Sequence, residues 1–258
     1  MVKLQNSLKI IPNLIKRMGF KRGLLYILYT LKIKKLNQNI IHQTKSGINI
    51  PLVDKRIFLY YNKYNESSII DFVDNSREFG TFINIGSAYG EYLFFSAINP
   101  NITKIYGFEP IPKSFNIINQ VLEINQKLAK KIKIQNIALG DFTGTTKFYL
   151  DKLSLTDSSL SPSTQSEEIE VKIAKLDDLE LDIKGNVLLL IDVEGFEIEV
   201  LQGAKNLLNK LKPIIIMEVW KRNVPTYKEM IPNFGYKCDH VWTSRRATTE
   251  YWKLIPKH

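Results

Sequence analysis

The sequence has few of the residues that form disulfides and zinc sites. Its 258 residues include one cysteine, Cys238, and three histidines. One cysteine cannot form an intrachain disulfide, and three scattered histidines do not supply a zinc cluster. We therefore expect a reducing compartment and a cytoplasmic location.

Long apolar runs and the dinucleotide-binding fingerprint are also missing. The longest uncharged apolar run of the N-terminal region, residues 23–31, is far shorter than the roughly 20 residues that a spanning helix needs. The pattern G-x-G-x-x-G does not occur in the chain. Its absence argues against a nicotinamide or flavin enzyme.

Acidic residues are absent from residues 1–53, which contain ten lysines and arginines. Subtracting these ten from the 36 basic residues of the chain leaves 26, which equals the 26 acids. The net charge of +10 therefore belongs to the N-terminal region, and the remainder is neutral. We divide the chain into a basic arm, residues 1–53, and one domain, residues 54–258. A neutral domain does not favour nucleic acid as a partner.

The arm carries basic residues that alternate with apolar ones at roughly helical spacing over residues 8–36. An amphipathic helix there can pack its apolar face on the domain. Alternatively, it can lie on an anionic membrane surface as a peripheral contact. The first interpretation is favoured, because apolar periodicity most often marks a core. A cleaved signal peptide fits less well, since charges interrupt the apolar stretch.

From residue 81 onward, short apolar strands alternate with amphipathic helices. The strands are expected at 81–85, 104–110, 131–139, 187–191, 213–219, 236–242 and 250–256. The helices are expected at 91–98, from Pro112 and over 196–211. This alternation predicts repeated βαβ units and thus an α/β fold with a doubly wound, mainly parallel sheet. Residues 143–150 and 168–176 predict a β-rich, hairpin-like insertion around a Ser/Thr-rich loop.

Open α/β sheets bind ligands at the carboxyl ends of their strands. The first strand is followed by Gly86-Ser87-Ala88-Tyr89-Gly90, where Gly86 can form a tight turn and Gly90 lets a helix begin close to a ligand. Glu109 follows the second strand, where a carboxylate can accept two hydrogen bonds from a ribose diol. The other interpretation of Glu109 is a surface residue at a strand end. The turn and the acid together indicate a nucleoside.

Asp192 and Glu194 follow the strand of residues 187–191. Alternation along a strand would place both side chains on one side of the sheet. Two adjacent acids are costly to bury without a partner. They can bind a divalent metal, position a substrate hydroxyl or act as a general base; helix capping explains one acid better than two. Glu218, after the next strand, is a weaker candidate of the same kind.

Several segments together resemble one known family. They are FINIGSAYGEY, YGFEPIPKSF, NIALGDFTG, DSSL, AKLDDL, LLLIDVEGFEIEVLQGA and IIIMEV. Their order and spacing over about residues 80–220 are similar to those of the FkbM family of S-adenosylmethionine-dependent methyltransferases. The resemblance implies a seven-stranded, Rossmann-like class I methyltransferase fold. It also implies methylation of a hydroxyl oxygen on a sugar, glycan, lipid-linked or polyketide-like acceptor.

The resemblance further implies S-adenosyl-L-methionine as the cofactor and assigns residues to it. Gly86 and Gly90 would lie at its methionine part, and Glu109 at its ribose. The implied cofactor-binding residues are Asn84, Gly86, Ser87, Ala88, Gly90, Glu109, Ile137, Ala138 and Asp141, of which the last three would lie near the adenine. Asp192 and Glu194 would be the catalytic residues, with Asp192 closest to the acceptor oxygen and Glu194 as a second base or a metal ligand. We interpret residues 154–166 as a lid over the acceptor.

Two positions depart from the family pattern, in which Asp usually stands at Asn84 and Asn at Ala88. Asn84 still accepts a hydrogen bond but lacks the charge that would attract the cofactor's ammonium or sulfonium group. A non-catalytic or cofactor-impaired binding module on the same scaffold is therefore the rival hypothesis. An RNA methyltransferase is a weaker alternative, because the domain is neutral and no N-P-P-Y amine-binding motif occurs.

Overall fold

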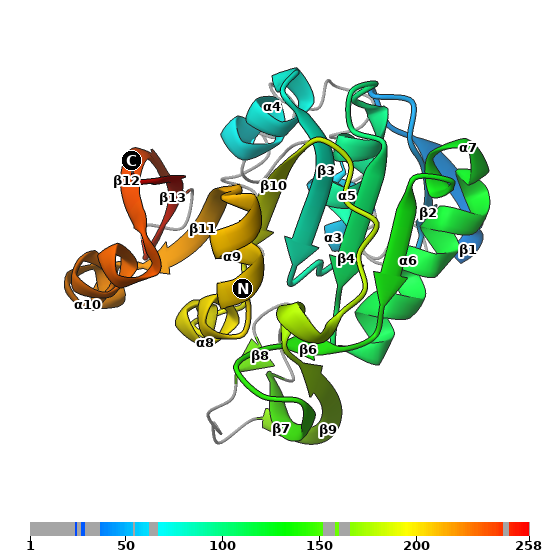
Figure 1. Ribbon diagram of the computed structural model, residues 1–258. Helices are drawn as coiled ribbons and strands as arrows, with labels where there is room; N and C mark the ends of the chain where they lie inside the picture. The colour runs from blue at the N-terminus through cyan, green and yellow to red at the C-terminus, as the bar shows by residue number, and fades with distance from the viewer. Residues whose placement is uncertain are drawn as a thin grey trace.

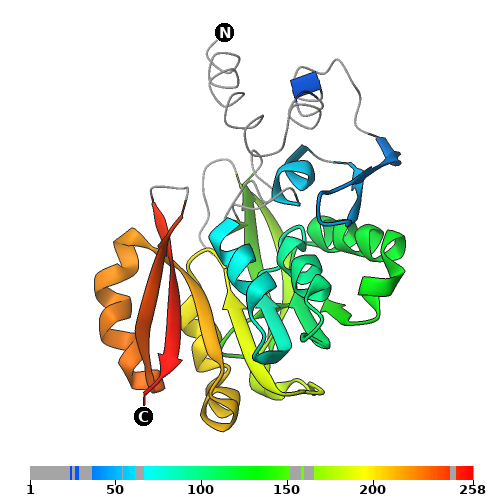
Figure 2. The same ribbon diagram turned by 90° about the horizontal axis from the view of Figure 1, so that it is seen from above.

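The computed structural model describes residue 24 and residues 27–28, 37–53, 55–61, 67–151, 158–159, 166–244 and 248–257. The helix expected over residues 8–36 and the lid expected over residues 154–166 lie almost wholly outside these ranges. Figures 1 and 2 show the described elements from two directions. None of the helices in this part of the chain combines the length and the apolar character that spanning a membrane requires.

A seven-stranded sheet forms the centre of the molecule (Figure 1). Its strands lie in the order β12, β13, β11, β10, β3, β4, β5. Their bounds are β3 Phe79–Ile85, β4 Lys104–Phe108, β5 Ile132–Gln135, β10 Asn186–Ile191, β11 Ile214–Trp220, β12 Tyr236–Thr243 and β13 Thr249–Pro256. Strand β10 pairs in parallel with β3 and β11, and β4 pairs in parallel with β3 and β5.

The sheet is mixed, and not mainly parallel as the sequence predicted. Strand β13 pairs antiparallel with both β11 and β12. The physical reason is the short connection between β12 and β13, because a parallel pair would need a crossover of a dozen or more residues between them.

Helices cover both faces of the sheet, which explains why the central strands are apolar on both sides. The first face is covered by α3 Lys55–Tyr60, α4 Ser67–Asn75, α5 Glu91–Ile98 and α6 Pro112–Ile124, followed by α7 Gln126–Ala129. The second face is covered by α8 Glu197–Gln202, α9 Lys205–Leu211 and α10 Val224–Met230. Short 3-10 turns lie at Leu176–Asp178, Lys221–Asn223 and Ile231–Phe234.

A smaller four-stranded sheet forms the predicted β-rich insertion. It consists of β6 Ala138–Leu139, β7 Gly144–Asp151, β8 Ser158–Ser159 and β9 Ser166–Ala174, in the order β6, β9, β7, β8. The strand predicted over residues 131–139 is split between the two sheets as β5 and β6. The Asn136 amide donates to the carbonyl oxygens of Glu109 and Pro110 at 2.8 and 3.0 Å, which fixes the turn between them.

The helix predicted over residues 196–211 is also two helices, α8 and α9. The carboxylate of Asp177 accepts hydrogen bonds from the backbone N–H groups of Asn206 and Leu207, both at 2.8 Å. These bonds satisfy the free N–H groups at the start of α9, so a new helix can begin there.

The last part of the predicted arm packs on the domain. Strands β1 Asn37–Gln43 and β2 Asn49–Leu52 form an antiparallel pair, and Ile48 and Ile50 are fully buried in the core. The side chain of Asn125, which follows α6, bonds to the backbone N–H and C=O of Asn49 at 2.9 and 2.7 Å. The predicted domain boundary at residue 53 stays a prediction.

Candidate active site

The turn between β3 and α5 is built from left-handed backbone. Gly86, Ala88 and Gly90 have φ angles of 79°, 46° and 83°. A Cβ atom added to Gly86 would lie 1.8 Å from the carbonyl oxygen of Asp192. Position 86 therefore requires glycine. Because glycine has no side chain, the turn can lie directly against the end of β10.

Gly90 also lies close to other parts of the protein. An added Cβ atom would lie 3.0 Å from the Ile118 side chain and 3.3 Å from the Tyr61 hydroxyl oxygen. With its left-handed φ, Gly90 lets α5 begin close to α6 and to the end of α3. This close approach is made within the protein, and the predicted approach of Gly90 to a ligand stays a prediction.

Asn84 lies inside the sheet, in β3. Its side chain is fully buried, and neither amide atom has a hydrogen-bond partner among the described residues. Alternation along β3 places it on the same face as Phe82, which is covered by α4 and α5. Buried polar groups are normally hydrogen-bonded, so this amide has unused capacity for a ligand.

Glu109 joins the end of β4 to the glycine turn. Its carboxylate accepts the backbone N–H of Ala88 at 2.7 Å and that of Ile111 at 2.8 Å. The residue is 3% exposed, and burial raises the pKa of its carboxyl group to about 8 against the opposite effect of the two hydrogen bonds. The sequence-predicted pair of turn and strand-two acid is thus in direct contact.

The three residues expected near the adenine are arranged less uniformly. Ile137 is half-buried and Ala138 is buried in β6, and both follow Asn136, whose amide binds the Glu109 carbonyl. Asp141 is exposed and lies beside Gly203 at the end of α8. The structure therefore places Ile137 and Ala138 next to the Glu109 loop, and Asp141 farther along the insertion.

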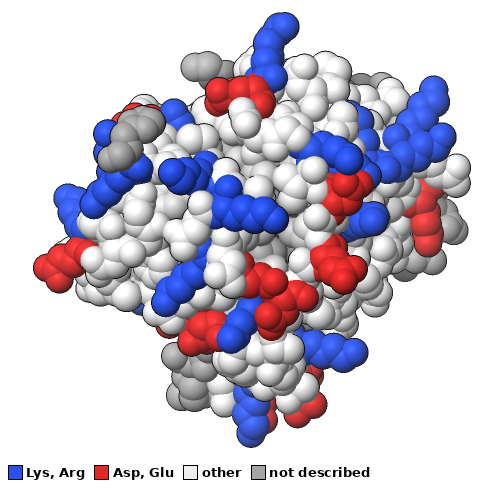
Figure 3. Space-filling model, viewed as in Figure 1, with Lys and Arg blue, Asp and Glu red and all other residues white. Residues whose placement is uncertain are grey.

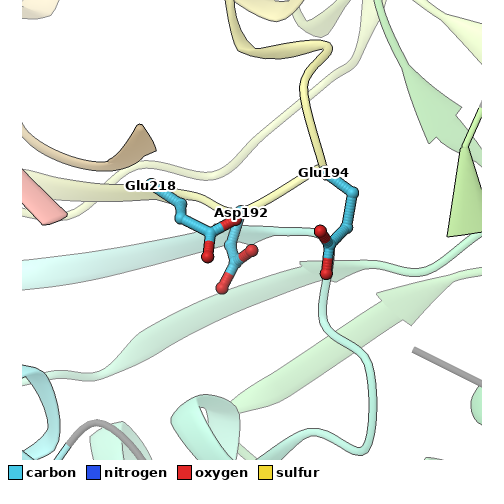
Figure 4. A group of neighbouring side chains, drawn as sticks. All are labelled: Asp192, Glu194 and Glu218. Carbon is cyan, nitrogen blue, oxygen red and sulfur yellow. The ribbon is translucent and has the colours of Figure 1, made fainter. Parts of the chain in front are cut away.

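Asp192 and Glu194 lie together with Glu218 of β11. One carboxylate oxygen from each residue lies within 4.8 Å of the other two. Figure 4 shows the carboxyl groups of Asp192 and Glu218 beside each other and that of Glu194 on the following loop. The Tyr251 hydroxyl, from β13, donates to Oδ2 of Asp192 at 2.7 Å.

Glu194 lies on a turn after the strand, so the alternation of side chains along a strand does not determine its direction. Strand β10 ends at Ile191, and Glu194 has a left-handed φ of 56°. The prediction that Asp192 and Glu194 lie near one another is confirmed, but the argument from alternation was wrong. A turn, and not a continued strand, carries Glu194 to the site.

The electrostatic environment of the cluster is strongly acidic. Burial, and then the charges of Asp192 and Glu194, hold the pKa of Glu218 far above its ordinary value. Glu218 is 4% exposed, and its Oε2 atom has no hydrogen-bond partner among the described residues. The surroundings of Glu218 therefore favour its uncharged form.

Two further buried acids lie at this edge and were not predicted from the sequence. Glu91 begins α5 and is 5% exposed; burial raises its pKa to about 8, and the charges of Asp192 and Glu109 add to the effect. Glu197 accepts the Gly195 N–H at 2.9 Å and the Tyr227 hydroxyl at 2.8 Å, and burial raises its pKa to about 7. The available signal was an acid among apolar residues: one in "GEYLFFSA", and the first of two in "GFEIEVL".

Trp220 and Thr249 extend the same face of the sheet beyond the carboxylates. They pair across β11 and β13, two residues from the paired Glu218 and Tyr251. The indole N–H of Trp220 and the hydroxyl of Thr249 are buried and without partners in the described part of the chain. The Arg222 guanidinium lies 4.3 Å from the centre of the Trp220 ring. Trp220 and Thr249 come together only through the pairing of β11 with β13, so no local pattern in the sequence indicates them.

Comparisons with known proteins agree with this geometry. A family model described as the methyltransferase FkbM domain matches residues 82–239. A search of curated proteins found no match.

Solved structures of methyltransferases resemble the chain at low sequence identity. The methyltransferase FkbM of Methylobacillus flagellatus KT has a TM-score of 0.50 and 14% identity, over 97% of this chain and 60% of that one. The precorrin-6y C5,15-methyltransferase of Geobacter metallireducens GS-15 has a TM-score of 0.44 and 14% identity, over 74% and 87%. An rRNA methylase from Streptococcus thermophilus has a TM-score of 0.45 and 9% identity, over 74% and 95%. The chain thus spans about 60% of the Methylobacillus protein, with which it shares the class I methyltransferase fold.

Proposed function

This chain belongs to the FkbM methyltransferase family, whose members use S-adenosylmethionine, and from that premise we propose that it methylates a hydroxyl oxygen of a sugar, glycan or lipid-linked acceptor. The observation that carries the proposal is the position of Asp192. It lies at the carboxyl end of β10, in contact with the turn at Gly86 and hydrogen-bonded by Tyr251. A carboxylate held at this edge of the sheet can accept the proton of an alcohol.

The residues at the turn fit the cofactor that the family implies. Asn84 offers a buried amide donor and acceptor with no other partner among the described residues. Glu109 retains free lone pairs beyond the two N–H groups it binds, and these can accept the hydroxyls of a ribose. We assign Gly86, Ser87, Ala88 and Gly90 to the methionine side, and Ile137, Ala138 and Asp141 to the adenine side. Bound S-adenosylmethionine supplies a methyl group on a sulfonium centre.

The chain's own residues prepare the acceptor. Asp192 takes the proton of the hydroxyl, while the Tyr251 hydrogen bond holds the Asp192 carboxylate in one orientation. Glu194 belongs to the same cluster, where its carboxylate can orient a second hydroxyl of the acceptor. Removing the proton makes the oxygen a nucleophile where it can meet the methyl group in line.

Trp220 and Thr249 support a hydroxyl-rich acceptor such as a sugar. An indole provides a flat apolar surface, and its N–H and the Thr249 hydroxyl are buried groups without partners in the described residues. A sugar offers both an apolar ring face and hydroxyls that satisfy these groups. Charged side chains of both signs are interspersed over the face seen in Figure 3, which favours such an acceptor over RNA.

Ala88 favours a second candidate, a cofactor-impaired binding module. Its φ of 46° lies in the left-handed region, which costs a residue with a Cβ atom roughly 1–2 kcal/mol and which Asn tolerates better. With Asn84 in place of an acid, the turn also lacks a charge opposite to the sulfonium. Both features weaken cofactor binding and leave the fold intact.

Methyl transfer from labelled S-adenosylmethionine to a panel of glycans and lipid-linked sugars tests the proposal. Asp192→Asn should lower turnover about a hundredfold or more at unchanged cofactor affinity, as expected for loss of a general base. Glu180→Gln, which changes an exposed acid, is the matched control and should leave turnover unchanged. Unchanged turnover in cofactor-bound Asp192→Asn would show that Asp192 is not the base.

A further inference from the structure

The Asp192, Glu194 and Glu218 carboxylates form a three-residue cluster on the ligand-binding edge of the sheet. They come from the end of β10, from the turn after it and from β11 (Figure 4). Burial of the set differs, because Glu218 is 4% exposed whereas Asp192 and Glu194 are half-buried. The cluster thus extends from a buried position on the sheet to two partly exposed positions at its edge.

The spacing of the three carboxylates matches what one cation can span. Two ligands on opposite sides of a metal ion are separated by twice the metal–oxygen distance, about 4.2 Å for Mg²⁺ and about 4.8 Å for Ca²⁺. The ligand oxygens of the cluster all lie within 4.8 Å of one another. Binding one Mg²⁺-sized ion therefore requires side-chain rotations that draw the three carboxylates closer together.

Unsatisfied buried oxygens at the cluster are a second observation that points to a ligand. Oε2 of Glu218 has no hydrogen-bond partner among the described residues. The same holds for Oε2 of Glu91, which is 5% exposed and lies on a different element, the first turn of α5. The charge of Asp192 contributes to the raised pKa of Glu91, so the two carboxyl groups interact electrostatically. A lone pair buried without a donor is costly, and a cation or its bound water supplies what is missing.

We propose that Asp192, Glu194 and Glu218 bind one divalent cation of the hard, oxygen-preferring class, Mg²⁺ or Mn²⁺. Three carboxylates supply oxygen ligands of the kind that these ions prefer. The Tyr251 hydroxyl donates to Oδ2 of Asp192 and orients that ligand from outside. The remaining positions of the ion are left for water and for the acceptor.

The use of the ion in methyl transfer rests on the proposed function. A cation beside Asp192 attracts the oxygen of an acceptor hydroxyl and makes its proton easier to remove. An acceptor with two neighbouring hydroxyls, as in a sugar, can approach such an ion through both oxygens. The inference therefore deepens the acceptor assignment, while binding of the ion itself can be measured without any acceptor.

Titration of the purified full-length chain with Mn²⁺, followed by electron paramagnetic resonance, tests the site directly. One Mn²⁺ per chain is expected, with displacement by excess Mg²⁺. Asp192→Asn, Glu194→Gln and Glu218→Gln should each weaken binding about tenfold or more. Glu229→Gln, an exposed acid on α10, is the matched control and should bind like the unaltered chain. Circular dichroism verifies that each variant is folded.

Failure of the inference and failure of the proposed function can be told apart. A folded, unaltered chain that binds no Mn²⁺ at millimolar concentration overturns the cation site, even if methyl transfer is detected. Binding that the three cluster variants leave unchanged also overturns it. One-to-one Mn²⁺ binding that is lost in the variants supports the site, even if no S-adenosylmethionine binds and the proposed function falls.

Discussion

The buried carboxyl group of Glu91 should make the folding stability of this protein depend on pH. It is 5% exposed, Oε2 lacks a hydrogen-bond partner among the described residues, and its pKa is raised from 4.5 to about 8. A raised folded-state pKa means that the charged form is disfavoured in the folded protein. Its contribution to stability is therefore full below pH 4.5 and is lost as the pH rises toward 8.

Glu91→Gln should remove this pH dependence. Each pH unit between 4.5 and about 8 corresponds to about 1.4 kcal/mol, so the variant should be more stable at pH 8, by an amount on the order of 4 kcal/mol. At pH 4.5 the two proteins should differ little. Urea unfolding in the presence of a chelator, at several pH values from 4.5 to 8.5, measures the difference. Parallel curves for the two proteins would contradict the assignment.

Glu109 should make cofactor affinity pH-dependent. Its pKa of about 8 means that the carboxyl group is largely protonated at pH 6, and a ribose diol binds best to the ionised form. Affinity for S-adenosylhomocysteine should therefore rise about tenfold from pH 6 to pH 8. Calorimetry at pH 6 and pH 8 measures this affinity. The control is Glu109→Gln, which should bind S-adenosylhomocysteine weakly and with the same affinity at the two pH values.

The sequence predicted the position of those candidate residues that directly follow a strand, while their roles stay a prediction. Gly86, Glu109 and Asp192 were found because the carboxyl ends of parallel strands meet at one edge of the sheet. Tyr251 and Trp220 were not found, since their place at the site depends on how the last hairpin pairs with β11. That pairing has no local signal in the sequence.

At the scale of elements, the site depends on how closely β3 approaches β10. Gly86→Ala would place a Cβ atom 1.8 Å from the Asp192 carbonyl oxygen and should destabilise the protein by about 3 kcal/mol or more. Gly235 has a similar φ of 81° but open space around it, so Gly235→Ala should cost only about 1 kcal/mol. Thermal unfolding compares the two variants. Equal losses would show that backbone conformation alone, and not the approach, requires Gly86.

The last strand, β13, should affect catalysis through Tyr251. Tyr251→Phe removes the hydrogen bond to Asp192, which favours the charged carboxylate. We expect kcat to fall about tenfold, the KM for cofactor to stay the same, and the acidic limb of the pH–rate profile to move to higher pH. A lower rate with an unmoved profile would indicate a purely structural role.

The sequence predicted elements well where apolar periodicity and a stop signal coincide. Helix α5 has the predicted bounds, Glu91–Ile98, and α6 begins at the predicted Pro112. The split of α8 from α9 was not predictable, because it depends on Asp177, a residue distant in sequence that binds the start of α9. The antiparallel β13 was missed for a similar reason, since strand direction is set by the connection and not by composition.

At the scale of the whole molecule, the site is wider than the segment by which the family is recognised. The family model covers residues 82–239, whereas Tyr251 and Thr249 belong to β13, beyond that segment. The proposed function therefore assigns the cofactor side to the part that matches the family and part of the acceptor side to β13.

Calorimetric titration of the full-length chain with S-adenosylmethionine tests the central claim most directly. The account predicts one binding site per chain in the micromolar range, with affinity lowered at least about tenfold by Glu109→Ala and unaffected by Glu180→Gln. No binding at high micromolar cofactor by a folded protein would contradict it, and would favour a methyltransferase scaffold that has lost its cofactor.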